Sequence, residues 1–139
     1  MRVDLAPARE SRQTVQSRAL LTFLAQADRC LTAQEIHAQL HRQGSGIALA
    51  TVYRWLTRLV RSGAVDVLMH DDGEATYVRG SDRHHHHLVC RSCGRVTEIS
   101  EPMVERWTVE VATRAGFADV SHALTVFGTC SACRGSGPS

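Results

Sequence analysis

Two Cys-x-x-Cys pairs and an internal run of histidines constrain the fold of this chain more than any other feature of its sequence. The first pair lies in HHHHLVCRSCGR (residues 84–95), directly behind four consecutive histidines, and the second lies in TCSACRG (129–135). Four soft thiolates are the complement of a closed tetrahedral zinc site, which has no open position for a substrate. The spacing therefore predicts a structural zinc ion held by Cys90, Cys93, Cys130 and Cys133.

A structural metal suits a chain of this size. The 139 residues allow one compact domain or two small ones, and the smaller of two would bury too little apolar surface to be stable alone. The 43% of hydrophobic and 22% of charged residues are ordinary for a globular protein. No apolar run approaches a membrane span, and the opening MRVDLAPARESRQ lacks the apolar core of a signal peptide. We therefore expect a cytoplasmic protein with no membrane partner, where paired cysteines indicate zinc rather than disulfides.

The histidine run differs in character from the thiols. An expression tag would lie at a terminus, and a solvated polar loop would leave the adjacent thiols unexplained. Successive side chains of an extended segment point to opposite faces, so the run predicts two pairs that serve two sites. Nitrogen and oxygen ligands bind divalent metal less tightly than four thiolates, which suits a sensor. The pairs are His84 with His86 and His85 with His87; Glu105 and His122 are candidate partners for one pair, and Asp66 is a candidate for the other.

Three segments of the N-terminal half have helical periodicity. In residues 13–27 the apolar positions at this spacing, expected to face inward, are Val15, Ala19, Leu20, Phe23, Leu24 and Ala27. Residues 31–44 begin with a capping box of Thr32 and Glu35, turn Ile36 and Leu40 inward, and end at Gly44. The third segment, SGIALATVYRWLTRLVRSG (45–63), has its inward positions at Val52, Leu56, Leu59 and Val60.

Two other potential ligands in this half have simpler interpretations. Cys30, between the first two helices, is expected to be a small buried hydrophobic residue. His37 and His41 are four residues apart but have no third ligand nearby, so we interpret them as surface residues.

The other face of the third helix is basic and contains no acidic residue. Because the net charge of the whole chain is only +2, a surface for nucleic acid has to be local like this one. After the helix, AVDVLMH (64–70), DDGE (71–74) and ATYVR (75–79) predict a β-hairpin. Three helices followed by a hairpin predict a winged helix-turn-helix, whose third helix enters the major groove of double-stranded DNA. The residues expected on this basic face are Thr51, Tyr53, Arg54, Trp55, Arg58 and Arg61.

A second domain follows the polar stretch GSDR (80–83). We place a DNA-binding domain at 1–80, a hinge at 81–83 and a metal-binding domain at 84–139. The second domain is predicted to contain a strand interrupted by a metal knuckle (88–100), a helix (101–116) and a further strand (117–130). The helix has Pro102 near its first turn, Gly116 past its end, and Val104, Trp107 and Val111 facing inward. The fold class is therefore α+β.

Catalytic readings of the zinc ligands are not supported by the motifs. A zinc deaminase requires His-x-Glu and a Pro before its Cys-x-x-Cys, and a zinc protease requires His-Glu-x-x-His. Neither these motifs nor a Gly-rich phosphate loop nor a Ser elbow occurs in the sequence. We therefore expect no enzyme and no small-molecule substrate.

Taken together, the motifs resemble the ferric uptake regulator family, and within it the zinc uptake regulators (Zur) of high-GC Gram-positive bacteria. The resemblance depends on TAQEIH (32–37), ATVYRWL (50–56), HHHHLVCRSCG (84–94) and FGTCSAC (127–133), and spans nearly the whole chain. It implies a winged-helix domain, a C-terminal α/β dimerisation domain, and a homodimer that binds a palindromic operator when loaded with metal and represses zinc uptake genes. The alternatives are a regulator of the same family for iron, manganese or nickel, and a zinc-storing protein that never meets DNA.

The resemblance also assigns roles to residues, with one structural and one or two regulatory zinc ions per subunit. It implies that a hinge site of Asp66, His85 and His87 fixes the angle between the domains, so that zinc raises operator affinity and leaves the fold intact. A second regulatory site tunes the dimer through His84, His86, Glu105 and His122. The DNA contacts come from Thr51, Tyr53, Arg54, Arg58 and Arg18.

This sequence departs from the family pattern at three places. The Cys expected before the histidine run is Gly80, which predicts a weaker hinge site, recruitment of water, Ser81 or Asp82, or preference for another metal. The usual Thr-x-Gln-Arg occurs as TVQSR, with its arginine displaced to Arg18. The usual Ser or Thr before TVYR is Ala50, which predicts the loss of a helix cap worth about 1 kcal/mol.

Overall fold

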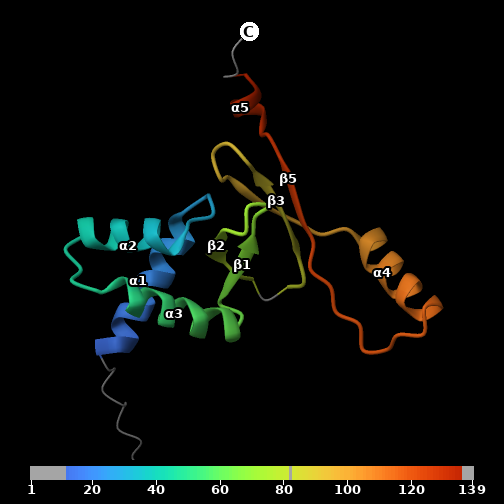
Figure 1. The fold of residues 1–139 in the computed structure, drawn as a ribbon, viewed down its shortest axis with the longest axis horizontal. Helices are drawn as coiled ribbons and strands as arrows, with labels where there is room; N and C mark the ends of the chain where they lie inside the picture. Colours follow the sequence, from blue (N-terminus) through green and yellow to red (C-terminus); the bar gives the residue numbers. More distant parts are fainter. Residues whose placement is uncertain (1–11, 82, 136–139) are drawn as a thin grey trace, which may run out of the picture. The chain divides into compact units, whose positions relative to one another are not determined.

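The computed structural model describes residues 12–81 and 83–135, which form two compact units (Figure 1). The first unit contains residues 12–27 and 32–80, and the second contains residues 28–31, 81 and 83–135. Helices and sheets are both present, so the α+β class expected from the sequence is confirmed. Within the described ranges, no helix has the length and apolar character needed to span a bilayer.

The first unit is three helices followed by a hairpin, the order that the sequence predicts. The helices are α1 (Arg12–Gln26), α2 (Ala33–Arg42) and α3 (Leu49–Arg61), drawn in blue to green in Figure 1. Strands β1 (Val65–Met69) and β2 (Ala75–Arg79) pair antiparallel, with Val65 opposite Arg79 and Met69 opposite Ala75. The Asp/Gly turn between them is closed by the hydrogen bond that His70 N donates to Glu74 O at 2.9 Å.

Helix α2 begins at the predicted capping box. The Thr32 hydroxyl accepts a hydrogen bond from Glu35 N, and the Glu35 carboxylate accepts one from Thr32 N, each at 3.1 Å. Ile36 and Leu40 are buried as predicted. Gly44 follows the helix at φ +87°, a left-handed conformation that glycine adopts without steric cost.

Some helix faces differ from the prediction. Trp55 is only 2% exposed, so its assignment to the basic face was wrong; it lies one turn from buried Val52 and widens the apolar stripe of α3. Val15 and Ala19 are exposed rather than inward, because α1 packs through Leu20 and Leu24 in its later turns. The cap prediction for Ala50 was also wrong, because α3 begins two residues earlier in the sequence than assumed, with Ala48 at its N-cap.

The second unit is a small mixed sheet with one long helix. Its strands β3 (His86–Cys90), β4 (Val96–Ile99) and β5 (Thr125–Gly128) have the order β4-β3-β5. Strand β3 runs antiparallel to β4 and parallel to β5. Helix α4 (Pro102–Arg114) separates β4 from β5, and a single turn, α5 (Ser131–Arg134), follows β5. The strand predicted over 117–130 is therefore shorter than expected.

Helix α4 starts at Pro102 and ends before Gly116, as predicted, but its apolar face is not covered. Trp107 is 61% exposed and Val111 is also exposed, which contradicts their inward assignment; Val104 is half-buried. Within the described part of the second unit, no other element covers these exposed side chains. Further exposed apolar side chains of the unit are Leu88, Met103, Val109, Phe117, Val120, Leu124 and Val126.

Residues Asp28–Leu31 belong to the second unit although they lie between α1 and α2 in sequence. Cys30 N donates to Gly94 O at 2.9 Å, and Val96 N donates to Asp28 O at 3.1 Å. Arg29 and Arg95 form an antiparallel bridge between these hydrogen bonds. Cys30 is buried, so that prediction is confirmed.

Candidate metal centres

The four paired cysteines meet at one end of the sheet. Cys90 ends β3, and Cys93 lies in the following turn, which Gly94 closes by donating from its N to Cys90 O at 2.9 Å. Because β5 runs parallel to β3 and Cys90 lies opposite Gly128, the segment after β5 reaches the same end. All four Sγ atoms lie within 4.8 Å of one another, and the Sγ atoms of Cys93 and Cys130 are 3.9 Å apart.

The electrostatics of this cluster favour a cation. Cys130 N donates to Cys90 Sγ at 3.3 Å, and this backbone hydrogen bond, with a second from Cys93, lowers the pKa of Cys90 to about 6. The hydrogen bonds of Cys133 with the Cys130 thiol and then the other thiols raise its pKa to about 12. Four thiols crowded this closely cannot all ionise alone, whereas a divalent ion stabilises all four thiolates. The residues therefore fit a tetrahedral zinc ion.

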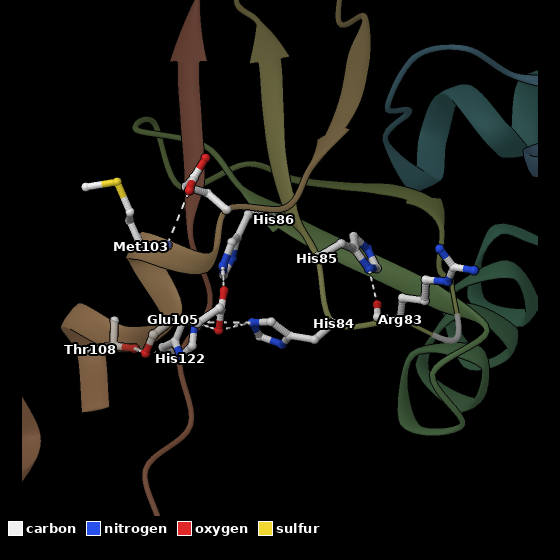
Figure 2. Close-up of polar contacts among 9 residues, drawn as sticks. Arg83, His84, His85, His86, Met103, Glu105, Thr108 and His122 are labelled. Atoms are coloured by element: carbon white, nitrogen blue, oxygen red, sulfur yellow. Dashed lines mark hydrogen bonds and ion pairs between the residues drawn. The ribbon is translucent and has the colours of Figure 1, made fainter. Parts of the chain in front are cut away.

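A second cluster gathers three imidazoles around one carboxylate (Figure 2). His86 Nε2 lies 2.6 Å from Glu105 Oε1, while His84 Nε2 and His122 Nε2 lie 3.0 and 2.8 Å from Glu105 Oε2. The Nε2 atoms of His84 and His122 are 3.2 Å apart. Three nitrogens and a carboxylate that converge in this way match the ligands of a divalent transition metal. We call these four residues the His3Glu cluster.

Alternation of side chains along the segment that leads into β3 explains why His84 and His86 join the cluster and their neighbours do not. The rings of His84 and His86 lie 4.8 Å apart, as do those of His85 and His87, so the predicted division into two pairs is confirmed. Glu105 lies in the first turn of α4, and His122 comes from the segment before β5. Burial would raise the pKa of Glu105, but the hydrogen bonds of His86 and His122 outweigh it and the pKa is lowered. The carboxylate is thus held in its ligating form.

The residues of the predicted hinge site belong to different units. Asp66 lies on β1 of the first unit, opposite Val78. His85 and His87 lie in the second unit, where His85 Nδ1 is 2.6 Å from the carbonyl oxygen of Arg83 and 3.0 Å from the Ser81 hydroxyl. Asp82, the other residue named as a recruit, lies outside the described residues. The hinge site remains a prediction from the sequence.

Helix α3 presents the predicted DNA residues to solvent. Tyr53 is 46% exposed, and Arg54 is exposed with its Nη2 donating to the Thr51 hydroxyl at 3.2 Å. Arg58 is exposed on the same helix, and Arg18 is exposed on α1. Burial, together with nearby Tyr53, raises the pKa of Tyr77 on β2.

Sequence reasoning missed two residues near the histidines. Glu98 on β4 places Oε1 3.7 Å from His85 Nε2. Thr108 on α4 places its hydroxyl oxygen 3.5 Å from His122 Nδ1. No local pattern marks either residue, because each meets its histidine through tertiary structure alone.

This chain is similar to known proteins along most of its length. The sequence model of the ferric uptake regulator family matches residues 8–127. The zinc uptake regulation protein of Mycobacterium tuberculosis is 52% identical over 123 residues, which cover 88% of this chain and 95% of that protein. The crystal structure of M. tuberculosis FurB, a zinc uptake regulator, is 51% identical, with a TM-score of 0.53 and coverage of 93% of this chain and 100% of that one. A zinc uptake regulator complexed with zinc and DNA is 26% identical, with a TM-score of 0.74 and coverage of 92% and 87%.

Proposed function

Because the chain belongs to the ferric uptake regulator family, we propose that it is a zinc-responsive transcriptional repressor that binds palindromic operator DNA as a metal-loaded homodimer. The observation that carries this proposal is the presence, in one chain, of a four-thiol cluster, the His3Glu cluster and an exposed basic helix. The relative from M. tuberculosis is named a zinc uptake regulation protein, and a related zinc uptake regulator has been solved with zinc and DNA. The protein would act in the cytoplasm and control genes for zinc uptake and homeostasis.

The two kinds of zinc site would have different roles, one structural and one regulatory. Cys90, Cys93, Cys130 and Cys133 would hold one structural ion, because a closed set of thiolates binds tightly and leaves no exchangeable position. The His3Glu cluster would hold a regulatory ion, and so would Asp66, His85 and His87 at the hinge predicted from the sequence. Their imidazole and carboxylate ligands release metal more readily, as a sensor requires.

The DNA contact would be made by the exposed face of α3. Arg54 donates one hydrogen bond to Thr51, which fixes the guanidinium and leaves its other donors for a phosphate or a guanine edge. Tyr53 would contact the groove beside it, and Arg58 and Arg18 would contact phosphates. An isolated helix of this kind binds weakly, so the two copies in a dimer are needed to engage both half-sites.

The uncovered apolar face of α4 supports the homodimer. Trp107, Val111 and Phe117 are all exposed large apolar side chains of the second unit. An apolar surface of this kind is characteristic of protein interfaces and is costly in water. A second copy of the chain would cover it and would place two α3 helices for a palindromic site.

The proposal is tested by zinc titration against a labelled palindromic operator. The protein is first stripped of exchangeable metal while its four thiolates retain zinc, which metal analysis verifies. We expect added zinc to raise operator affinity at least tenfold. Replacing Asp66 or His85 with Ala should abolish this response and leave the structural zinc in place. Unchanged affinity on adding zinc would contradict regulation through the hinge.

A substitution on α3 separates a repressor from a zinc-storing protein. Arg54→Ala should abolish operator binding without changing the number of zinc ions bound. Arg114→Ala is the matched control, because Arg114 is an exposed arginine on α4 of the second unit and not on the predicted DNA-binding helix. Operator binding by Arg54→Ala at the level of Arg114→Ala would contradict the assigned contact. Titration with iron(II), manganese(II) or nickel(II) in place of zinc identifies a regulator of the same family for another metal.

A further inference from the structure

His122 Nδ1, the ring nitrogen on the side away from Glu105, has a partner within the second unit. Thr108 lies on α4 three residues after Glu105, and Figure 2 shows it beside His122. Its hydroxyl oxygen is 2.9 Å from the carbonyl oxygen of Glu105 and 3.5 Å from His122 Nδ1. His122 Nε2, on the other side of the ring, faces Glu105 Oε2 and His84 Nε2 at 2.8 and 3.2 Å.

The single hydroxyl hydrogen of Thr108 determines where His122 carries its proton. A carbonyl oxygen can only accept, so the 2.9 Å contact takes the hydroxyl hydrogen. Toward His122 the hydroxyl oxygen then acts as an acceptor, which requires a hydrogen on Nδ1. The nitrogen left to bind metal is Nε2, the atom that already faces the other ligands.

The three imidazoles of the His3Glu cluster differ in what lies next to the ring nitrogen that does not face Glu105. The side chain of His84 is 52% exposed, so water reaches its outer nitrogen. His86 is 1% exposed, and its Nδ1 has no hydrogen-bond partner among the described residues. His122 alone of the three receives a side-chain acceptor from the described part of the chain. A partner of this kind fixes the tautomer and orientation of a metal-binding histidine, and its loss typically costs about 10- to 100-fold in metal affinity.

We propose that Thr108 is a positioning residue of the His3Glu cluster, which holds the Nδ1 proton of His122 and so presents Nε2 to the regulatory metal. The inference rests on the metal site of the proposed function, but not on DNA binding. Because 3.5 Å is long for a hydrogen bond, the expected effect lies at the lower end of the range, about tenfold.

The test compares Thr108→Val, Thr108→Ser and Thr113→Val in full-length protein that retains zinc on its four thiolates. All variants carry His85→Ala so that the hinge site does not contribute. Valine preserves the shape of threonine and removes the hydroxyl, serine keeps the hydroxyl, and Thr113 is an exposed threonine on the same helix. Zinc affinity is measured by competition with a chromophoric chelator, and the ring nitrogens of His122 are followed by ¹⁵N NMR.

We expect Thr108→Val to bind zinc about tenfold more weakly, with Thr108→Ser and Thr113→Val within twofold of the parent. In the parent, zinc should move the Nε2 resonance of His122 while Nδ1 stays protonated. Equal affinities for Thr108→Val and Thr113→Val would overturn the inference and leave the site intact. So would weak binding by Thr108→Ser, because loss of packing would then be the cause. An Nε2 resonance that does not respond to zinc in the parent would overturn the proposed site itself.

Discussion

Removal of the structural zinc should unfold the second unit and leave the first unit folded. The two units differ in how much apolar surface they bury. Among the described residues of the second unit, the buried apolar side chains other than cysteine are Leu31 and Val89. The first unit buries a much larger set, namely Leu20, Leu24, Ala33, Ile36, Leu40, Val52, Trp55, Leu56, Val65 and Leu68.

The magnitudes indicate that the metal dominates the stability of the second unit. Burying Leu31 and Val89 contributes about 1.5–3 kcal/mol each, or roughly 3–6 kcal/mol together. Structural zinc sites in small domains contribute about 10–16 kcal/mol at pH 7. The proposed dimerisation through the α4 face would add to the smaller figure, but it requires a folded sheet and helix first. Loss of one thiolate should therefore cost more than the apolar core of this unit supplies.

Hydrogen exchange resolved by mass spectrometry on short peptides measures this directly. Cys133→Ser, or chelation of the unaltered protein, should lower the protection of β3 and β4 at least a hundredfold, while α2 and α3 keep theirs within a few-fold. Cys30→Ala is the matched control, because Cys30 is a buried cysteine outside the four-thiol cluster. Retention of protection in β3 after complete zinc removal would refute the reasoning, since packing alone would then hold the sheet.

Three further substitutions test local energetics. Ala48→Ser should raise the unfolding free energy of the first unit by about 1 kcal/mol in denaturant titration, because α3 begins without a side-chain cap. An unchanged unfolding free energy would contradict the assignment of residue 48 as the N-cap. Gly80→Ala should lower it by roughly 1–3 kcal/mol, because a Cβ would overlap the carbonyl oxygen of Gly63, and an unchanged midpoint would contradict that overlap. Val111→Asp should make the protein monomeric in analytical ultracentrifugation, because it places a charge in the uncovered apolar face of α4; a persistent dimer would place the interface elsewhere.

Local patterns in the sequence predicted the elements that local chemistry decides. The capping box of Thr32 and Glu35, the hairpin turn and the alternation of the histidines each depend on residues a few positions apart. These features need no knowledge of how distant segments pack. The grouping of Glu105 and His122 with His84 and His86 was implied by the family resemblance and not by local pattern.

Features that depend on packing were predicted less well. The position of Trp55 depends on how wide the buried stripe of α3 is, and periodicity alone does not fix that width. The inward prediction for Trp107 assumed that an apolar helix face is covered by its own chain, whereas here the face is exposed. The pairing of Asp28–Leu31 with residues 94–96 and the contact between Thr108 and His122 are long-range, and neither has a sequence signature.

The environment of Gly80 gives a physical reason for the departure from the family pattern at this position. Gly80 N donates to Ala64 O at 2.9 Å, and a side chain at this position would overlap the backbone of Gly63. A cysteine here would require the backbone to move. The absence of a thiolate at this position is therefore tied to the backbone packing of the first unit. The proposed regulatory sites have only imidazole and carboxylate donors, while the thiolates are concentrated in the proposed structural site. Since such donors bind divalent metal more weakly, the regulatory sites should fill only at zinc concentrations at which the structural site is already occupied.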